Sequence, residues 1–258
     1  MDKINNIKLL TEYDGTAYIG WQVQPNGRSV QGVIEDKLRK IAPDSTGLIA
    51  AGRTDAGVHA LRQVACFRSS VKHPPDTIKR ALNALLPRDI KIVGAGYCNQ
   101  SFHPRFDAKK KTYTYVIYSG RNASPFIYRY VWRVNQKLNI HRMKMASAFL
   151  TGKHDFSSFR ASGCASGNPV REIMSLAIKK TKTINFLDFK IEGAFVIIDI
   201  EANAFLRHMV RNIVGTLVQT GTGRSMPEDV KKILSARDRT VAGPTAPASG
   251  LFLKKIYY

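Results

Sequence analysis

The residues best suited to chemistry are gathered in one short segment, 50-AAGRTDAGVHA-60. Its single carboxylate, Asp55, lies between Gly52 and Gly57, which let the backbone turn tightly and leave room for a ligand to approach. Arg53 would keep that carboxylate ionised and can also contact a phosphate group. The segment therefore indicates a catalytic or ligand-binding loop, although an Asp-capped turn beside a surface arginine would have the same composition.

The overall charge indicates the kind of ligand. The 258 residues include 40 Lys or Arg and 19 Asp or Glu, so the formal net charge is +21 at pH 7. The basic residues run through the whole chain and do not form one block. Regularly spaced phosphates favour such a distribution through counterion release, so we expect a nucleic acid partner before an anionic membrane or an acidic protein.

Other global features exclude several classes of protein. Hydrophobic residues make up 44% of the chain, which excludes bulk disorder. No apolar run approaches the roughly 20 residues of a membrane span, and the N-terminus does not have the pattern of a secretory signal. Cys66, Cys98 and Cys164 are odd in number and far apart, which excludes a disulfide framework and a CxxC metal site. We therefore expect a cytoplasmic protein.

The elements that would position Asp55 alternate in type. The hydrophobic pattern of the first half predicts four strands and two helices in the order strand, helix, strand, strand, helix, strand. Their expected ranges are 7–15, 29–42, 47–53, 63–69, 75–86 and 89–98. This order is the ferredoxin-like plan, and it places Asp55 directly after the third element.

The second half has a related order of elements, without a repeat at the level of residues. We expect strands and helices over 111–119, 138–150, 171–181, 195–201, 204–221, 227–236 and 251–258, with one further candidate strand near 184–191. Arg207 and Arg211 are four residues apart on the 204–221 helix, so they would share one side of it. The following 221-GTGRS-225 predicts a helix C-cap and not a phosphate loop, because it follows a helix and lacks the Walker spacing.

Seven blocks also carry a family resemblance. GRTDAGVHA is similar to the active-site signature of pseudouridine synthases, and the other six are similar to one branch of them. They are 12-EYDGTAYIGWQVQPNGRSVQGVIE-35, 83-NALLPRDI-90, 102-FHPRFDAKKKTYTYVI-117, 154-HDFSSFRASG-163, 202-ANAFLRHMVRNIVGTL-217 and 246-APASGLFL-253. The chain thus resembles the bacterial tRNA pseudouridine synthase A family, which modifies uridines 38, 39 and 40 in the anticodon stem-loop.

The resemblance implies a fold and an assembly. The fold is α+β, with two ferredoxin/RRM-like halves side by side that form one continuous, mostly antiparallel sheet with flanking helices. Residues 1–106 would form the half with the catalytic loop, and residues 107–258 the half with the uracil-stacking tyrosine and the arginine helix. The implied enzyme is a cytoplasmic isomerase that works as a homodimer on tRNA, flips the target base and needs no cofactor or metal.

The resemblance also implies roles for five residues. Asp55 matches the nucleophile, Tyr113 the tyrosine that stacks on the target uracil, and Arg211 the basic residue that pairs with the aspartate. Arg53 matches an arginine that helps to displace the target base, and Leu253 an aliphatic residue that closes the pocket. A buried packing role is the alternative for a strand tyrosine, and we keep it for Tyr115. The chain departs from the family pattern at two positions, Arg207 and Ser249, which bear on RNA contacts and not on the reaction.

Two other functions remain open at this stage. A metal-dependent ribonuclease would need further carboxylates near Asp55, which Glu12 and Asp14 could supply only if the fold brought them there. A non-catalytic RNA-binding module is disfavoured, because the chain lacks the RNP1 aromatic pattern. His59 and His154 could act as general bases, but loop histidines more often have a structural or RNA-facing role.

Overall fold

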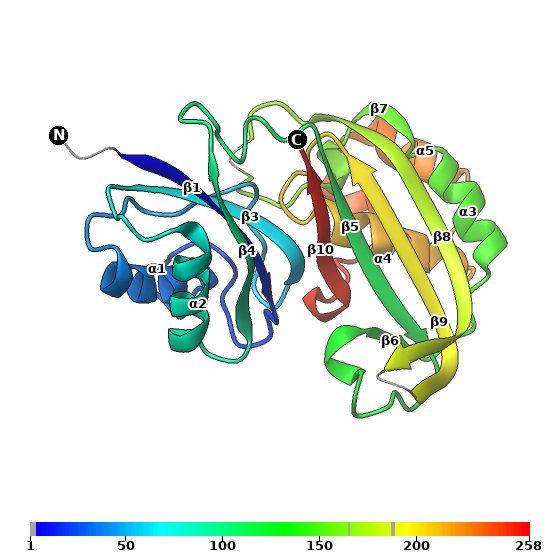
Figure 1. Cartoon of the computed structure of the whole chain (residues 1–258). Helices are drawn as coiled ribbons and strands as arrows, with labels where there is room; N and C mark the ends of the chain where they lie inside the picture. Colours follow the sequence, from blue (N-terminus) through cyan, green and yellow to red (C-terminus); the bar gives the residue numbers. More distant parts are fainter. Residues whose placement is uncertain (1–3, 165, 187–188) are drawn as a thin grey trace. The chain divides into compact units, whose positions relative to one another are not determined.

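The chain folds into two compact units in the computed structural model, which describes residues 4–164, 166–186 and 189–258 (Figure 1). Unit 1 is formed by the residues up to Lys109 together with Phe252–Tyr258, and unit 2 by Lys110–Leu251. Each unit combines helices with a mostly antiparallel sheet, so the predicted α+β class is confirmed. The predicted continuity of the two sheets stays a prediction.

Unit 1 follows the predicted order of elements. These are β1 (Asn5–Tyr13), α1 (Val30–Ile41), β2 (Ile49–Ala50), β3 (His59–Ser69), α2 (Pro75–Leu85), β4 (Ile90–Cys98) and the C-terminal β10 (Leu251–Tyr257). β1 lies between β3 and β4 and is antiparallel to both, whereas β10 is parallel to β3. Ile7 and Leu9 alternate along the buried face of β1, and both are fully buried. The central strand is thereby held on both edges, with β3 leading back to the segment that contains Asp55.

The two helices of unit 1 have the sequence signals that predicted them. The Ser29 side chain accepts a hydrogen bond from the Gly32 N–H at 3.2 Å and so caps the first turn of α1. Pro75 opens α2, at a position where its missing N–H costs nothing. Each helix buries one apolar stripe, and α1 and α2 contact each other.

Unit 2 is a sheet packed with three helices. Its elements are β5 (Lys110–Ser119), β6 (Trp132–Val134), α3 (Ile140–Ala148), β7 (Gly152–Asp155), β8 (Val170–Phe186), β9 (Phe189–Ala202), α4 (Met209–Gly221) and α5 (Asp229–Ala236). The strand order β5-β9-β8-β7 is antiparallel throughout, and the short β6 pairs parallel with β5. Every residue of α4 is buried except Arg211 and Gln219. These two polar side chains are therefore the ones of α4 that remain partly accessible.

Several predicted boundaries are wrong. The candidate strand near 184–191 is not a separate element: residues 184–186 end β8 and residues 189–191 begin β9, while 187 and 188 lie outside the described residues. The sequence did not predict β6 and β7. α4 begins at Met209 and not at residue 204, because His208 adopts a left-handed backbone with φ 62°. Arg207 therefore lies outside the helix and is exposed. The prediction that Arg207 and Arg211 share one helical side is wrong.

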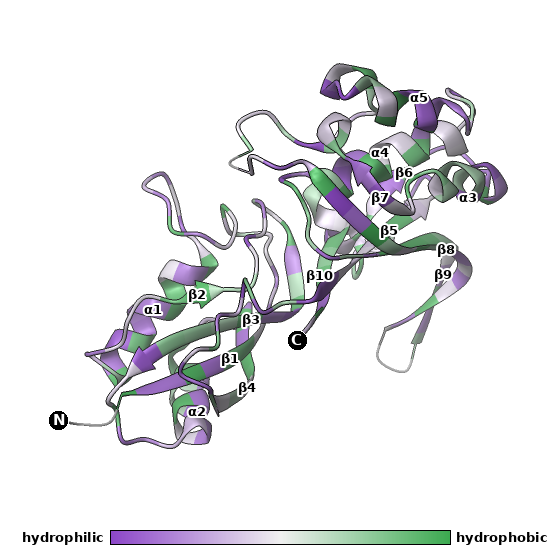
Figure 2. Ribbon diagram, turned by 90° about the horizontal axis from the view of Figure 1, so that it is seen from above, coloured by the Kyte–Doolittle hydropathy of each residue, from purple (hydrophilic) through white to green (hydrophobic). Residues whose placement is uncertain are grey.

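The polar residues are distributed over both units. Figure 2 shows hydrophilic and hydrophobic residues interleaved along the helices and strands of both units. Within the described residues, no helix combines the length and the hydropathy that a membrane crossing requires.

Candidate active site

Asp55 lies in the loop between β2 and β3, and backbone bonds fix this loop against the segment after β1. The Trp21 N–H donates to the Thr54 carbonyl at 3.1 Å, and Asp55 forms an isolated bridge with Gly20. The Gly57 N–H donates to the Tyr18 carbonyl at 3.2 Å. The Asp55 side chain is partly exposed, so a carboxylate is presented from a main chain that is held on both sides.

Two glycines before the loop allow this close approach. A Cβ at Gly20, which has φ 112°, would lie 2.5 Å from the Thr54 carbonyl oxygen. A Cβ at Gly15 would lie 2.0 Å from the carbonyl oxygen of Val58. Both distances are far inside van der Waals contact. Only glycine at these two positions therefore allows residues 15–20 to pack directly against the Asp55 loop.

His59 anchors the end of the loop. Its ring is 1% exposed and stacks on Phe252 of β10, with ring centroids 4.7 Å apart. Nδ1 lies 3.1 Å from the Gly15 N–H donor and 3.0 Å from Asp14 Oδ1. An unprotonated Nδ1 accepts from Gly15, whereas a protonated Nδ1 donates to Asp14, so the ring can hold residues 14–15 in either state. This burial supports a structural role for His59.

Further residues that support the loop were not singled out from the sequence. The Tyr13 hydroxyl hydrogen-bonds the Thr54 hydroxyl at 2.8 Å, and the Gln63 amide donates to the Gly52 carbonyl at 2.6 Å. Burial raises the pKa of Tyr13, so its phenol stays protonated. Tyr13 and Trp21 lie in the 12–35 block that carries the resemblance, which is the signal that could have identified them. Gln63 lies outside the blocks that carry the resemblance, so the sequence did not identify it.

Arg53 and Leu253 lie in the same unit as Asp55. Arg53 is exposed on the loop itself. Leu253 is buried on β10, where it pairs with Ala60 while Phe252 pairs with His59. Unit 1 therefore places Leu253 on the strand beside the one that the Asp55 loop enters.

Tyr113 and Arg211 belong to unit 2. Tyr113 lies on β5 opposite Ile200, is 8% exposed, and meets Phe205 edge to face with ring centroids 5.0 Å apart. Two residues along the strand, Tyr115 is fully buried and donates to the Pro247 carbonyl at 2.7 Å. The packing role predicted for Tyr115 is thus confirmed.

Arg211 connects α4 to the block before β10. Its Nε donates to the Ala246 carbonyl at 2.7 Å, and the Ala246 N–H donates back to the Arg211 carbonyl at 3.1 Å. Burial raises the pKa of Tyr115, and the positive charge of Arg211 opposes that rise in part. The two hydrogen bonds with Ala246 therefore hold the Arg211 guanidinium in a fixed orientation.

Asp14, one of the two acids that a metal-dependent ribonuclease would need near Asp55, is engaged in structural bonds. Asp14 Oδ1 accepts from the Thr16 N–H at 2.9 Å and lies beside His59. Among the residues with a described placement, no group of three or more His, Cys, Asp or Glu side chains is arranged to hold a metal ion. Cys66, Cys98 and Cys164 are free thiols.

Comparison with known proteins places the chain in a family. The sequence profile described as "tRNA pseudouridine synthase" matches residues 9–107 and 146–258, which include Asp55, Arg211 and Leu253. The chain belongs to the tRNA pseudouridine synthase family. Members of this family are isomerases that convert uridine to pseudouridine in tRNA.

Individual relatives match over nearly their whole length. A tRNA pseudouridine synthase A from Thermoanaerobacter sp. (strain X514) is 43% identical over 255 residues, which is 99% of this chain and 100% of that protein. One from Citrifermentans bemidjiense is 44% identical over 256 residues, 99% of this chain and 98% of that protein. One from Myxococcus xanthus is 43% identical over 252 residues, 98% of this chain and 91% of that protein. The similarity therefore extends over both units of this pseudouridine synthase family member.

Proposed function

We propose that this protein converts uridine to pseudouridine at positions 38, 39 and 40 in the anticodon stem-loop of tRNA, with Asp55 as the nucleophile. The observation that carries the proposal is the Asp55 loop: the one carboxylate of the segment 50–60 is partly exposed on a backbone fixed by the segment around Gly20. The net charge of +21 suits a substrate with a phosphate backbone.

The reaction requires few groups from the protein. The N1–C1′ glycosidic bond breaks, the uracil turns, and a C5–C1′ bond forms; the C5 proton leaves and N1 gains a proton. No electron or group is lost overall, so the isomerisation needs no redox cofactor. A fixed carboxylate can form a covalent intermediate at C1′ or at C6 of the base, and then be released when the new bond closes.

Four further residues complete the proposed site. Tyr113 stacks on the target uracil after the base leaves its helix, which compensates part of an unstacking cost of a few kcal/mol. Arg211 pairs with Asp55 and keeps the carboxylate ionised. Arg53, exposed on the loop, helps to displace the base, and Leu253 closes the pocket.

The assembly and location follow the same resemblance. We place the enzyme in the cytoplasm as a homodimer that binds the anticodon arm of tRNA. Sedimentation of the protein with and without tRNA tests the dimer. Site-resolved pseudouridine mapping on tRNA from cells that lack the protein tests positions 38, 39 and 40.

Replacing Asp55 by Asn tests the nucleophile. The change keeps the size of the side chain and removes the charged oxygen, so turnover should fall by at least about a thousandfold while tRNA affinity stays within about threefold. Pseudouridine is measured by carbodiimide-induced reverse-transcriptase stops, and affinity by filter binding.

Asp76→Asn is the matched control. Asp76 is an exposed acid on α2 that pairs with Lys79 and Arg80, so the same chemical change there should leave turnover unaltered. Turnover of Asp55→Asn within tenfold of the unaltered enzyme would show that Asp55 is not the nucleophile.

A further inference from the structure

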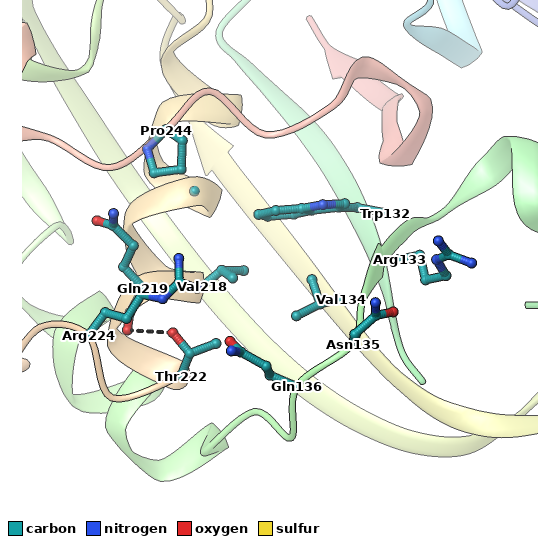
Figure 3. Close-up of a pocket in the computed structure, with 11 residues that line it drawn as sticks. Trp132, Arg133, Val134, Asn135, Gln136, Val218, Gln219, Thr222, Arg224 and Pro244 are labelled. Carbon is teal, nitrogen blue, oxygen red and sulfur yellow. Dashed lines mark hydrogen bonds between the residues drawn. The ribbon is translucent and has the colours of Figure 1, made fainter. Parts of the chain in front are cut away.

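A cavity in unit 2 is lined by none of the five residues that the proposed reaction uses. It measures about 310 Å³ and opens between β6 and α4, with Pro244 on one side (Figure 3). Trp132 and Val134 line it from β6, and Gln219 and Arg224 line it from α4 and the turn that follows. Pockets for small organic ligands begin at about 300 Å³, so this one has room for a single molecule of nucleoside size.

Trp132 provides an aromatic wall. The indole is partly exposed and extends from β6 toward α4, next to the open space of the cavity (Figure 3). Its ring meets Tyr115 edge to face, at 6.2 Å between centroids and 87° between planes. Because the Tyr115 hydroxyl is bound to the Pro247 carbonyl, the indole packs against a fixed neighbour. A preoriented aromatic face of this kind stacks on nucleobases of any sequence.

Three amide side chains line the same cavity as the indole. Gln219 is one of the two residues of α4 that are not buried, and Asn135 and Gln136 approach from the end of β6 (Figure 3). Each amide offers donors and an acceptor, which is the combination that reads the hydrogen-bonding edge of a base. Val134 is buried among them, so the cavity joins an apolar floor to polar edges.

Arg224 adds a positive charge to the same cavity. Gly223, with φ 83°, turns the chain back after α4, and the Arg224 N–H then donates to the Gln219 carbonyl at 2.9 Å. This confirms the predicted C-cap at 221-GTGRS-225 and places the arginine over the end of the helix. Among the described residues that line the cavity there is no Asp or Glu, so a phosphate would meet no opposing charge.

We propose that this cavity binds one unstacked nucleotide, with the base against Trp132, the base edge at Gln219 and Gln136, and the phosphate at Arg224. The nucleotide is either an unpaired residue of RNA or a free mononucleotide, which share this chemistry. The site goes beyond the proposed reaction and does not require Asp55.

Fluorescence of Trp132 tests the proposal directly. The chain has two tryptophans, and Trp21 is 2% exposed, so a ligand that reaches only accessible indole quenches Trp132. We expect saturable quenching by 5′-UMP and 5′-AMP and weaker binding of uridine, which lacks the phosphate. Arg224→Gln should raise the Kd for 5′-UMP about tenfold and change that for uridine little.

Arg237→Gln is the matched control. Arg237 follows α5, is not among the residues that line the cavity, and pairs with Asp155 at 3.3 Å. The same loss of one charge should therefore leave the Kd unaltered. Gln219→Leu, which keeps the helix apolar, should weaken uridine and 5′-UMP equally.

RNA hairpins with and without one unpaired nucleotide distinguish the two sources. Quenching by the hairpin with the unpaired nucleotide, but not by the fully paired one, assigns the site to RNA. Quenching by mononucleotides that neither hairpin displaces assigns it to a free nucleotide. Absence of saturable quenching by every ligand, or equal losses in Arg224→Gln and Arg237→Gln, would overturn the proposal. Because these measurements do not use turnover, loss of the isomerase assignment would leave their outcome unaffected.

Discussion

Tyr113 combines burial with a proposed contact to substrate. Its ring is 8% exposed and is held by Phe205, so truncation to Ala would open a cavity and destabilise unit 2 by about 3–5 kcal/mol. Tyr113→Leu fills more of that volume without an aromatic face, and Tyr113→Phe keeps the face without the hydroxyl. We expect the Phe variant to capture target RNA like the unaltered enzyme, and the Leu variant to bind it about tenfold more weakly.

The measurement combines RNA capture with thermal unfolding. The melting temperature shows whether each variant remains folded, and a 5-fluorouridine RNA reports capture of the target base. Equal capture by Tyr113→Phe and Tyr113→Leu would contradict the stacking role and leave Tyr113 as a packing residue like Tyr115.

The individual residues differ in how far the sequence could predict them. Asp55 was recognisable because glycines, an arginine and a histidine surround it within eleven residues. The anchoring role of His59 could not be recognised in the sequence. Its partners Asp14 and Gly15 are more than forty positions away, and only the fold brings them together. Contacts of this kind depend on the register of β1 against β3, and a pattern of period two is unchanged by a shift of two residues, so the pattern alone does not single out the register.

The anchor of the Asp55 loop can be tested through His59. His59→Leu removes the Gly15 acceptor, so an N–H loses its partner and the loop can shift. We expect kcat to fall roughly tenfold to a hundredfold, since small displacements of a catalytic group are costly, while tRNA affinity is retained. His59→Asn restores an acceptor and should recover part of the loss.

His154→Leu is the control for loss of an imidazole. His154 lies on β7, where its Nε2 is 2.9 Å from the Thr151 carbonyl oxygen. The His154→Leu substitution should leave kcat unaltered. An unaltered kcat in His59→Leu, or a loss confined to tRNA affinity, would show that His59 does not position the loop.

The hydrogen bonds of Asp44, in the turn between α1 and β2, should make the stability of the protein depend on pH. Asp44 accepts from the Ser69 hydroxyl, the Ser70 N–H and the Ser70 hydroxyl, and these bonds lower its pKa from 3.8 to about 2. A carboxyl with a depressed folded-state pKa stabilises the protein fully above its unfolded pKa, and that contribution disappears as the pH falls toward the folded value. Asp44→Asn should therefore destabilise the protein at pH 5 by more than at pH 2.

Denaturant unfolding at several pH values measures this difference. The gap in unfolding free energy between the unaltered protein and Asp44→Asn should narrow between pH 3.8 and about 2. Ser69→Ala removes the largest cause of the shift and should reduce the pH dependence. A gap that stays constant over this window would contradict the assignment.

The elements were predictable where local signals are strong and not where tertiary contacts decide. Ser29 and Pro75 mark helix starts that the structure confirms. The predicted start of α4 was wrong by five residues. The apolar pattern continues through Phe205 and Leu206, whereas the backbone at His208 is left-handed. β6 spans three residues and exists through its pairing with β5, so no periodicity could reveal it.

At the scale of the whole molecule, charge is shared between the units and not concentrated in one tail. Lysines and arginines lie on the Asp55 loop, on β5 and β8, and around α4 and α5. A substrate that meets both units would therefore contact several cations at once. Binding energy of this origin comes from counterion release and depends on salt, in contrast to stacking on Tyr113 or Trp132.

The salt dependence of tRNA affinity measures that contribution. Each neutralised phosphate adds about −0.7 to −0.9 to the slope of log K against log salt concentration, so five contacts would give a slope of roughly −4. Arg53→Gln should make the slope less steep by about one unit if the exposed arginine contacts a phosphate. Asp55→Asn should leave it unaltered, because its proposed contact is with the reacting nucleotide. A slope near zero between low and physiological salt would show that the charge of +21 does not serve RNA binding, and the affinity would then have to come from the base contacts alone.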